Sequence, residues 1–393
     1  MSETSKLRIL HFSPHNEDDG IAKYQEQYLA GMADDATVEN KFFDVKPIEL
    51  RGMNQQQHEE TYDKLREELQ DFDIFHIQHE FGLFVEDDFQ RLVSTAKDAG
   101  KKVVISVHLS PDFAIKPVKL GGLGPRSMVA FLRQQRHRNR MYERHMGPFL
   151  QADLLLVHND TTKDALLKAG AAPEKVMKLL HPVHQFPTPP KSDFIAKKLG
   201  KKKGDVIFCT VGMLHKYKGI FDAIRALKFL PPNYKLAIIG GLHPVETNIV
   251  SETVGIYNKI TDLIDVLGLH DRVYITGFVQ DDNKMNSYIR ECDVAVYPYD
   301  GVYYANVSSG AVNLGFSNGK PVVAYPTAGF RELATYTDGA LVLTDTFAYY
   351  ELARTLQTID LTKQGKLSDA YAKKMAWPNL AKELIAAYHK LAD

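Results

Sequence analysis

The sequence is poor in several features that would assign it to a specialised class of protein. It has 2 cysteines among 393 residues, and each lies in an apolar run without the spacing of metal ligands. We therefore expect Cys209 and Cys292 to be buried thiols of a protein from a reducing compartment, not parts of a disulfide framework. The formal net charge is -1, so no overall field favours nucleic acid or acidic partners.

Long apolar runs are also missing from the sequence. The first residues, MSETSKLRILHFS, lack the apolar core of a signal peptide, and no stretch approaches the roughly 20 apolar residues of a membrane span. We therefore expect no transmembrane segment. The prediction is a cytoplasmic protein that can at most lie on a membrane surface, at the inner face of the membrane.

The composition is sufficient for two domains with substantial cores. Hydrophobic residues make up 44% of the chain and charged residues 25%, and 393 residues exceed one ordinary domain. Apolar runs alternate with helical patterns in both halves, which predicts α/β domains with doubly wound parallel sheets. Because PVHQFPTPPKSD is rich in proline and KKLGKKKGD is basic, we place the first domain at 1–185, a linker at 186–204, the second domain at 205–375 and a final helix at 376–393.

The stretch YPYDGVYYANVSSGAVNLGFSNGKPVVAY contains the most distinctive pattern. It predicts a strand, a loop, a helix and a strand; Ser308, Ser309 and Gly310 open the helix, and Gly319 ends it. A helix start offers free backbone N–H groups and the positive end of a dipole, and the serines add two hydroxyls, so the stretch favours an anion site. Serines at a helix start also serve as simple N-caps, and for the dipeptide alone this alternative stays open.

Polar residues follow apolar strands in the first half of the chain. Gly20 follows the strand LRILHF and a polar loop, HIQHE places His79 and Glu80 at a strand end, and His108 closes the strand KVVISV. Since the carboxyl ends of parallel strands border the ligand crevice of doubly wound sheets, we expect these residues near a site, with His79 and Glu80 able to carry protons. A loop-to-helix turn is the alternative for Gly20. A structural, hydrogen-bonded role is the alternative for the histidines, and it is the role we assign to His76.

The second half contains comparable features. Lys218 follows a strand and places an ammonium, a usual partner of phosphate, at the strand's carboxyl end; a solvent-exposed loop lysine is the alternative. Glu332 follows the strand that begins at Val322. Its carboxylate can accept hydrogen bonds from sugar hydroxyls, or it can be a favourable charge in the first turn of a helix.

Arg126–Arg144 is the one clearly basic segment. It contains six arginines, and Met128, Val129, Leu132 and Met141 form an apolar stripe at helical spacing. This pattern predicts an amphipathic helix that contacts a membrane surface or a phosphorylated acceptor. A solvated helix face is the alternative.

In order and spacing, these motifs resemble a retaining glycosyltransferase of family four with the GT-B architecture. The similar segments are HIQHEFGLF, VISVHLSP, VGMLHKYKG, TGFV, GKPVVAYPTAGFREL and the tail from Trp377, so the resemblance covers nearly the whole chain. It implies two Rossmann-like domains that face a central cleft, an acceptor-side domain first and a donor-side domain second. The C-terminal helix would cross back onto the first domain.

The resemblance also implies an activity. A hexosyl group would pass, with retention, from a nucleotide-diphosphate sugar to a hydroxyl of a glycan, glycolipid or lipid-linked acceptor, as in polysaccharide biosynthesis. The donor would be a UDP- or GDP-sugar, and neither a metal nor another cofactor would be required. Lys218 would hold the diphosphate, Ser308, Ser309 and Gly310 would wrap the phosphates, and Gly20 would line the cleft.

The resemblance further implies that His108 contacts the transferred sugar near the reacting carbon. The family arginine near Lys218 is replaced by Met213, so His215 or Lys216 would have to supply that phosphate contact. The pattern thus departs from the family at the position of one cation.

A second departure concerns two glutamates of the family, whose positions hold Asn306 and Leu314. The Ser-Ser-Gly loop resembles a branch of the family that lacks the glutamate pair, and Asp300 or Glu332 would stand in for the lost carboxylate. Two other functions therefore stay open. One is a GT-B nucleotide-sugar isomerase, epimerase or hydrolase that uses His79 and Glu80, and the other is a non-catalytic nucleotide- or sugar-binding protein.

Overall fold

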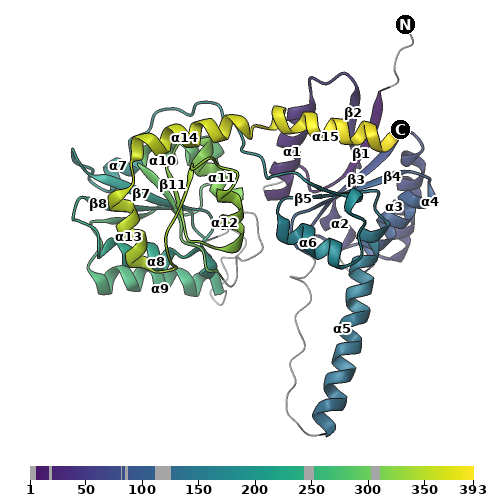
Figure 1. Ribbon diagram of the computed structural model, residues 1–393, viewed down its shortest axis with the longest axis horizontal. Helices are drawn as coiled ribbons and strands as arrows, with labels where there is room; N and C mark the ends of the chain where they lie inside the picture. Colours follow the sequence, from purple (N-terminus) through teal and green to yellow (C-terminus); the bar gives the residue numbers. More distant parts are fainter. Residues whose placement is uncertain are drawn as a thin grey trace. The chain divides into compact units, whose positions relative to one another are not determined.

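The chain forms two compact units of α/β structure. The computed structural model describes residues 6–16, 20–80, 82–84, 87–110, 125–242, 252–301 and 310–393. The first unit contains Met1–Leu180 and Pro378–Asp393, and the second contains His181–Trp377. Residues 186–204, which we expected to form a linker, therefore belong to the second unit. In Figure 1, helices flank a central sheet in each unit.

A parallel sheet of six strands, in the order β2-β1-β3-β4-β5-β6, forms the centre of the first unit. The strands are β1 (Leu7–Phe12), β2 (Val38–Phe42), β3 (Ile74–His79), β4 (Lys102–Val107), β5 (Leu154–Val157) and β6 (Val176–Lys178). All six side chains of β3 are buried, as in a parallel sheet that is covered on both faces. The register places Gln78 of β3 opposite Ser106 of β4.

Helices of the first unit cover this sheet. They are α1 (Gly20–Met32), α2 (Pro47–Leu50), α3 (Gln55–Leu69), α4 (Asp88–Asp98), α5 (Pro125–Gln151), α6 (Asp160–Lys168) and α15 (Trp377–Ala392), with the 3-10 turn η2 (Pro173–Lys175). Local signals set their ends: Asn54 and Gln57 form a capping box at the start of α3. Helix α15 comes last in the chain, yet its Tyr388 hydroxyl lies 2.7 Å from Nδ1 of His76 on β3.

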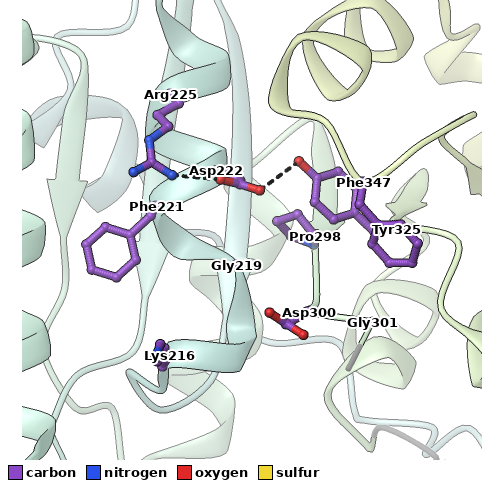
Figure 2. A pocket seen from close by; sticks show the side chains of 10 residues that line it. All are labelled: Lys216, Gly219, Phe221, Asp222, Arg225, Pro298, Asp300, Gly301, Tyr325 and Phe347. Atoms are coloured by element: carbon purple, nitrogen blue, oxygen red, sulfur yellow. Dashed lines mark hydrogen bonds and ion pairs between the residues drawn. The ribbon is translucent and has the colours of Figure 1, made fainter. Parts of the chain in front are cut away.

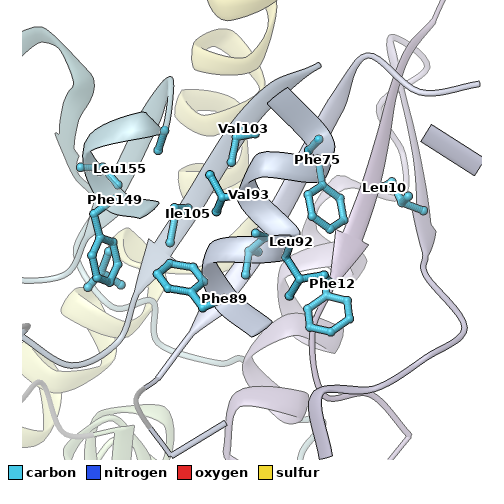
Figure 3. Close-up of a cluster of buried hydrophobic side chains, with 14 of the residues drawn as sticks. Leu10, Phe12, Phe75, Phe89, Leu92, Val93, Val103, Ile105, Phe149 and Leu155 are labelled. Carbon is cyan, nitrogen blue, oxygen red and sulfur yellow. The ribbon is translucent and has the colours of Figure 1, made fainter. Parts of the chain in front are cut away.

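An aromatic-rich core fills the space between this sheet and helices α4 and α5. Figure 3 shows Phe89 and Leu92 of α4 beside Phe75 and Ile105 of the sheet, together with Phe149 of α5. These side chains are almost fully buried, and each contributes about 1.5–3 kcal/mol of apolar transfer free energy. The core thus holds one face of β3 and β4 rigidly in place.

The second unit repeats the plan with the strand order β12-β11-β10-β7-β8-β9, again in parallel pairs. Its strands are β7 (Val206–Val211), β8 (Tyr234–Ile239), β9 (Val273–Ile275), β10 (Val294–Tyr297), β11 (Val322–Ala324) and β12 (Leu341–Leu343). Its helices are α7 (Phe194–Lys198), α8 (Ile220–Leu227), α9 (Glu252–Leu267), α10 (Asp282–Glu291), α11 (Gly310–Ser317), α12 (Ala328–Ala334), α13 (Tyr349–Thr358) and α14 (Leu361–Lys374), with the 3-10 turn η3 (Lys216–Lys218). The predicted α/β class with two doubly wound parallel sheets is confirmed.

Both cysteines lie in the core of the second unit. Cys209 is in β7 and Cys292 immediately follows α10, and both are buried and free, as predicted. Burial and the neighbouring Cys209 raise the pKa of the Cys292 thiol well above its usual value. Both residues therefore act as small apolar core side chains.

The basic segment forms the first two thirds of α5, a helix of 27 residues. Figure 1 shows the beginning of this helix extending away from the sheet of the first unit. Met128, Val129 and Leu132 are 44%, 66% and 51% exposed, whereas the side chain of Met141 lies outside the described residues. Across the described part of the chain, no helix combines the length and apolar character needed to cross a bilayer.

Candidate functional site

The strand order of the second unit marks the place where a ligand would bind. From β7 the chain moves to β8 and β9 on one side, and it then returns to the other side of β7 to form β10. The point where the direction reverses lies between β7 and β10. In doubly wound sheets, the crevice at the carboxyl ends of two such strands is the usual ligand site.

The turn between β7 and α8 packs tightly against the end of β10 at this point. Gly219 has a φ of +67°, which favours glycine, and a Cβ at this position would overlap the carbonyl oxygen of Pro298. Gly212, with a φ of +119°, begins the same turn. The lack of a side chain at Gly219 thus allows the turn to approach the end of the adjacent strand closely.

Lys218 lies in this turn and is held at the carboxyl ends of both strands. Its ammonium donates a hydrogen bond of 2.9 Å to the Tyr299 hydroxyl and lies 4.5 Å from the centroid of that ring. The Nζ atom is 3.9 Å from the position that a Cβ on Gly212 would occupy. An ammonium has three donors, so a cation fixed in this way is suited to bind a phosphate group.

Helix α11 begins nearby in the sequence, at Gly310. Ser308 and Ser309, and also Asn306, lie outside the described residues. At Gly310 the nearest side chain is that of His181, whose Nε2 lies 3.8 Å from the position of a Cβ on Gly310. The structure thus brings the imidazole of His181 to the first residue of the predicted anion-binding helix.

His181 and Asn313 lie together near the start of α11, and our sequence analysis did not single them out. Asn313 Nδ2 donates to the carbonyl oxygen of Pro182 at 3.0 Å and lies 2.9 Å from His181 Nδ1. Burial lowers the pKa of His181. The available signal was a polar residue in an otherwise apolar helix pattern. The structure buries Asn313 and leaves its neighbour Leu314 half-buried.

The remaining predicted residues of the second unit lie on different elements. His215 stacks on Tyr217 with centroids 5.1 Å apart. Glu332 lies in the second turn of α12, whose N-cap is Thr327, so the alternative of a first-turn charge is wrong. Met213, at the position of the family arginine, is 40% exposed.

A pocket of about 530 Å³ lies on the α8 side of the Lys216–Gly219 turn. Figure 2 shows Lys216, Gly219, Phe221, Asp222, Arg225, Pro298, Asp300, Gly301, Tyr325 and Phe347 around it. Asp222 accepts a hydrogen bond of 3.2 Å from the Tyr325 hydroxyl and pairs with Arg225 at 3.0 Å. Of its lining residues, the sequence analysis had singled out Asp300 and Lys216, but not the aromatic residues Phe221, Tyr325 and Phe347.

In the first unit, His79 and Glu80 lie in different surroundings. The His79 ring lies among Phe84, Phe89 and Phe149, with centroids 4.2–5.3 Å away. Burial, assisted by His145, lowers the pKa of His79 to about 3, so its ring is uncharged at neutral pH. The Glu80 carboxylate accepts a hydrogen bond of 2.8 Å from its own loop, from the N–H of Gly82.

His108 lies on the opposite face of the sheet from His79, because it contacts Gln78, which precedes His79 in β3. Its Nε2 is 2.7 Å from Oε1 of Gln78, and the ring of Tyr24 meets it edge-on at 4.8 Å. Gly20 begins α1, is exposed, and has no atom within 4 Å of the position of a Cβ. Among the described atoms, the space beside Gly20 is therefore open.

Comparisons with known proteins agree with this architecture. Residues 191–373, which cover most of the second unit, match the sequence family described as Glycosyl transferases group 1. No curated protein matches the chain in sequence.

Solved structures of similar fold cover nearly the whole chain. HepE of Anabaena in complex with UDP is 15% identical, with a TM-score of 0.68, over 98% of this chain and 100% of that chain. Sucrose-phosphate synthase from Thermosynechococcus elongatus is 15% identical, with a TM-score of 0.67, over 98% and 99%. Trehalose-6-phosphate synthase OtsA is 11% identical, with a TM-score of 0.65, over 98% and 99%. The chain therefore has the GT-B fold, and its second unit carries a match to the group 1 glycosyl transferases.

Proposed function

We propose that the chain is a retaining glycosyltransferase of family four that uses a nucleotide-diphosphate sugar. The observation that carries this proposal is the position of the Lys218 ammonium, which Tyr299 holds at the point where the strand order of the sheet reverses. Most of this second unit matches the family of group 1 glycosyl transferases. The similar HepE structures, which contain UDP and UDP-glucose, support a UDP-sugar as the first donor to test, with a GDP-sugar next.

In this proposal, Lys218 binds the diphosphate, and Ser308, Ser309 and Gly310 also bind its phosphates. His215 and Glu332 are further donor contacts, and Gly20 borders the sugar in the first unit. His108 contacts the transferred hexosyl group. We leave His79 and Glu80 out of this set, because the first is a core residue and the second is bonded to its own loop.

The reaction would break the bond between the anomeric carbon and the diphosphate oxygen. The acceptor hydroxyl would form the new bond on the same face of the sugar, and its proton would pass to an oxygen of the leaving diphosphate. Lys218 and the positive end of helix α11 would stabilise the charge that develops on the diphosphate, so the step would not require a metal ion.

The acceptor would be a glycan, a glycolipid or a lipid-linked hydroxyl compound, reached from the cytoplasmic face of a membrane. The support for a membrane contact is α5, where Met128, Val129 and Leu132 are exposed beside the exposed residues Arg133 and Arg136. Apolar and cationic side chains together favour an anionic lipid surface.

Calorimetry with UDP, GDP, ADP and their hexose conjugates tests the central claim. We expect one nucleotide class to bind the wild-type protein, and Lys218→Ala to weaken that binding. When a glycan acceptor is then added, the protein should transfer the sugar to it with retained configuration at the anomeric carbon. An epimerase or hydrolase would change the sugar nucleotide without an acceptor, and a protein that binds none of these nucleotides would contradict the proposal.

Vesicle flotation tests the membrane contact separately. We expect binding to vesicles of phosphatidylglycerol and not to those of phosphatidylcholine, and we expect Val129→Glu with Leu132→Glu to abolish it. Val266→Glu is the matched control, because Val266 is 82% exposed on α9 in the second unit. Equal flotation of the α5 variant and the wild type would contradict the role of α5.

A further inference from the structure

A row of buried polar side chains lies along one face of β3. Successive residues of a strand point to opposite faces, so His76 and Gln78 share a face while His79 points into the aromatic core on the other. His76 and Gln78 are both completely buried. Buried polar groups are costly unless hydrogen-bonded, so their partners define how this face is organised.

The inner end of the row is anchored by α15 and β4. Nδ1 of His76 lies 2.7 Å from the Tyr388 hydroxyl of α15, and its Nε2 lies 2.9 Å from the Ser106 hydroxyl of β4. Both ring nitrogens are thus engaged, and the ring has a fixed orientation. Burial keeps it uncharged by holding the pKa of His76 well below its usual value.

At the outer end of the row, Gln78 connects His76 to His108. Its amide nitrogen faces His76 Nε2 at 3.4 Å, and its amide oxygen lies 2.7 Å from His108 Nε2. An amide oxygen can only accept a hydrogen bond, so Nε2 of His108 must carry the hydrogen. In the neutral imidazole, the nitrogen without a hydrogen, and therefore the acceptor, is then Nδ1.

The plane of the His108 ring is restrained by two further rings. Tyr24 meets it edge-on at 4.8 Å, and His158 lies 5.1 Å away. His158 is itself held in place, because its Nδ1 donates to the carbonyl oxygen of Leu179 at 2.9 Å. The His108 ring can therefore neither tilt freely nor exchange its two nitrogens without breaking the bond to Gln78.

We propose that Gln78 is a positioning residue that locks His108 in the Nε2–H tautomer, so that His108 accepts a hydrogen bond from a hydroxyl of the transferred sugar. The sugar part of this inference rests on the proposed function, whereas the tautomer does not. The substrate class that follows is a hexosyl donor with a hydroxyl at the contacted carbon. A site built to bond a hydroxyl discriminates strongly against the analogue that lacks it.

Nitrogen NMR of protein labelled with 15N-histidine tests the tautomer directly, because protonated and bare ring nitrogens resonate far apart. His108→Gln identifies the His108 signals among the 15 histidines. At about pH 8 we expect a protonated Nε2 and a bare Nδ1. A protonated Nδ1 would show that the Gln78 amide has the reverse orientation, and it would overturn the proposal.

Variants separate positioning from general packing. Gln78→Leu should leave His108 as a mixture of tautomers. Gln25→Leu is the matched control, because Gln25 is an equally buried glutamine that contacts a different histidine, His11, at 3.1 Å. It should leave the His108 signals unchanged. Unchanged signals in Gln78→Leu, or equal changes in both variants, would overturn the role of Gln78.

The sugar contact is tested once a donor is known. Against donors lacking one hydroxyl each, the wild type should show a loss in kcat/KM of at least about 10-fold for one position, and Gln78→Leu should reduce that discrimination. Uniform tolerance of all deoxy donors would overturn the contact. A protein that binds no nucleotide would instead contradict the proposed function and leave the tautomer result standing.

Discussion

The ammonium of Lys218 is held by Tyr299 in two ways, by a hydrogen bond of 2.9 Å to the hydroxyl and by a position 4.5 Å from the ring centroid. The two residues come from opposite sides of the reversal point, one from the turn after β7 and the other from the chain after β10. A cation that is ordered before a ligand arrives loses less conformational entropy when it binds one. This relationship leads to the first prediction.

Lys218→Ala should weaken the binding of the recognised nucleoside diphosphate by about 10- to 150-fold, which corresponds to about 1.5–3 kcal/mol for one charge-assisted hydrogen bond. Tyr299→Phe should have a smaller effect, since its ring still attracts the ammonium. Titration calorimetry measures both. Lys228→Ala is the control, because Lys228 follows α8 and its ammonium donates to the carbonyl oxygen of Leu267 at 3.0 Å. Equal weakening by the two lysine variants would contradict the assignment.

Met213→Arg should strengthen nucleotide binding. Met213 is 40% exposed and follows Gly212, so a longer cationic side chain has room at the start of the turn. A second charge-assisted contact to a phosphate should tighten binding by about 10-fold. Met213→Gln, which has a polar side chain without a charge, should not. Unchanged affinity in the arginine variant would mean that the phosphates lie elsewhere.

Gly219→Ala should destabilise the second unit more than the same substitution does at another glycine with a positive φ. Gly268 is the matched control: its φ is +64°, close to that of Gly219, but it has no atom within 4 Å of the position of a Cβ. Gly268→Ala should cost about 1–2 kcal/mol of backbone strain alone. Gly219→Ala should cost about 1–3 kcal/mol more, because its Cβ meets the Pro298 carbonyl. Urea unfolding measures the difference, and equal losses would show that the turn adapts.

His79→Phe should reduce the acid sensitivity of the first unit. The pKa of His79 is about 3 in the folded protein, whereas the ordinary value of an unburied histidine is 6.5. Below pH 6.5 the unfolded chain therefore binds a proton that the folded chain does not. The free energy of unfolding falls with falling pH, by about 1.4 kcal/mol per pH unit from this residue. Phenylalanine removes this contribution.

Relative to the wild type, the His79→Phe variant should gain about 2 kcal/mol between pH 7.5 and pH 5. Urea unfolding followed by circular dichroism at both pH values measures this change, and the value at pH 7.5 serves as the reference for any difference in packing. A pH-independent difference would show that folding does not lower the pKa of His79.

Much of the fold follows from local patterns. Gly319 was predicted to end a helix, and the structure gives it a φ of +62° in the turn that follows the last residue of α11, Ser317. The strands β7 and β10 are continuous apolar runs, and such runs are typical of buried parallel strands. By contrast, β2 was not predicted. Its sequence VENKF buries only its first residue, since it is an edge strand without an apolar run.

The candidate site was harder to predict, because its contacts join residues far apart in sequence. The burial of Asn313 depends on Pro182, which lies 131 residues earlier in the chain. The spacing of apolar residues along the sequence does not predict contacts between residues so far apart. His79 and His108 both lie at strand ends, but which face each ring occupies is decided by packing: the aromatic side chains of α4 and α5 surround His79, whereas Gln78 holds His108.

The last helix, α15, belongs to the first unit although the whole second unit precedes it in the chain. During synthesis, the contact between His76 of this sheet and Tyr388 therefore cannot form until almost all of the polypeptide has been made. Domains usually fold as units in order from the N-terminus. Here the N-terminal unit is completed last, so premature termination near the C-terminus would leave the first unit unfinished rather than the second.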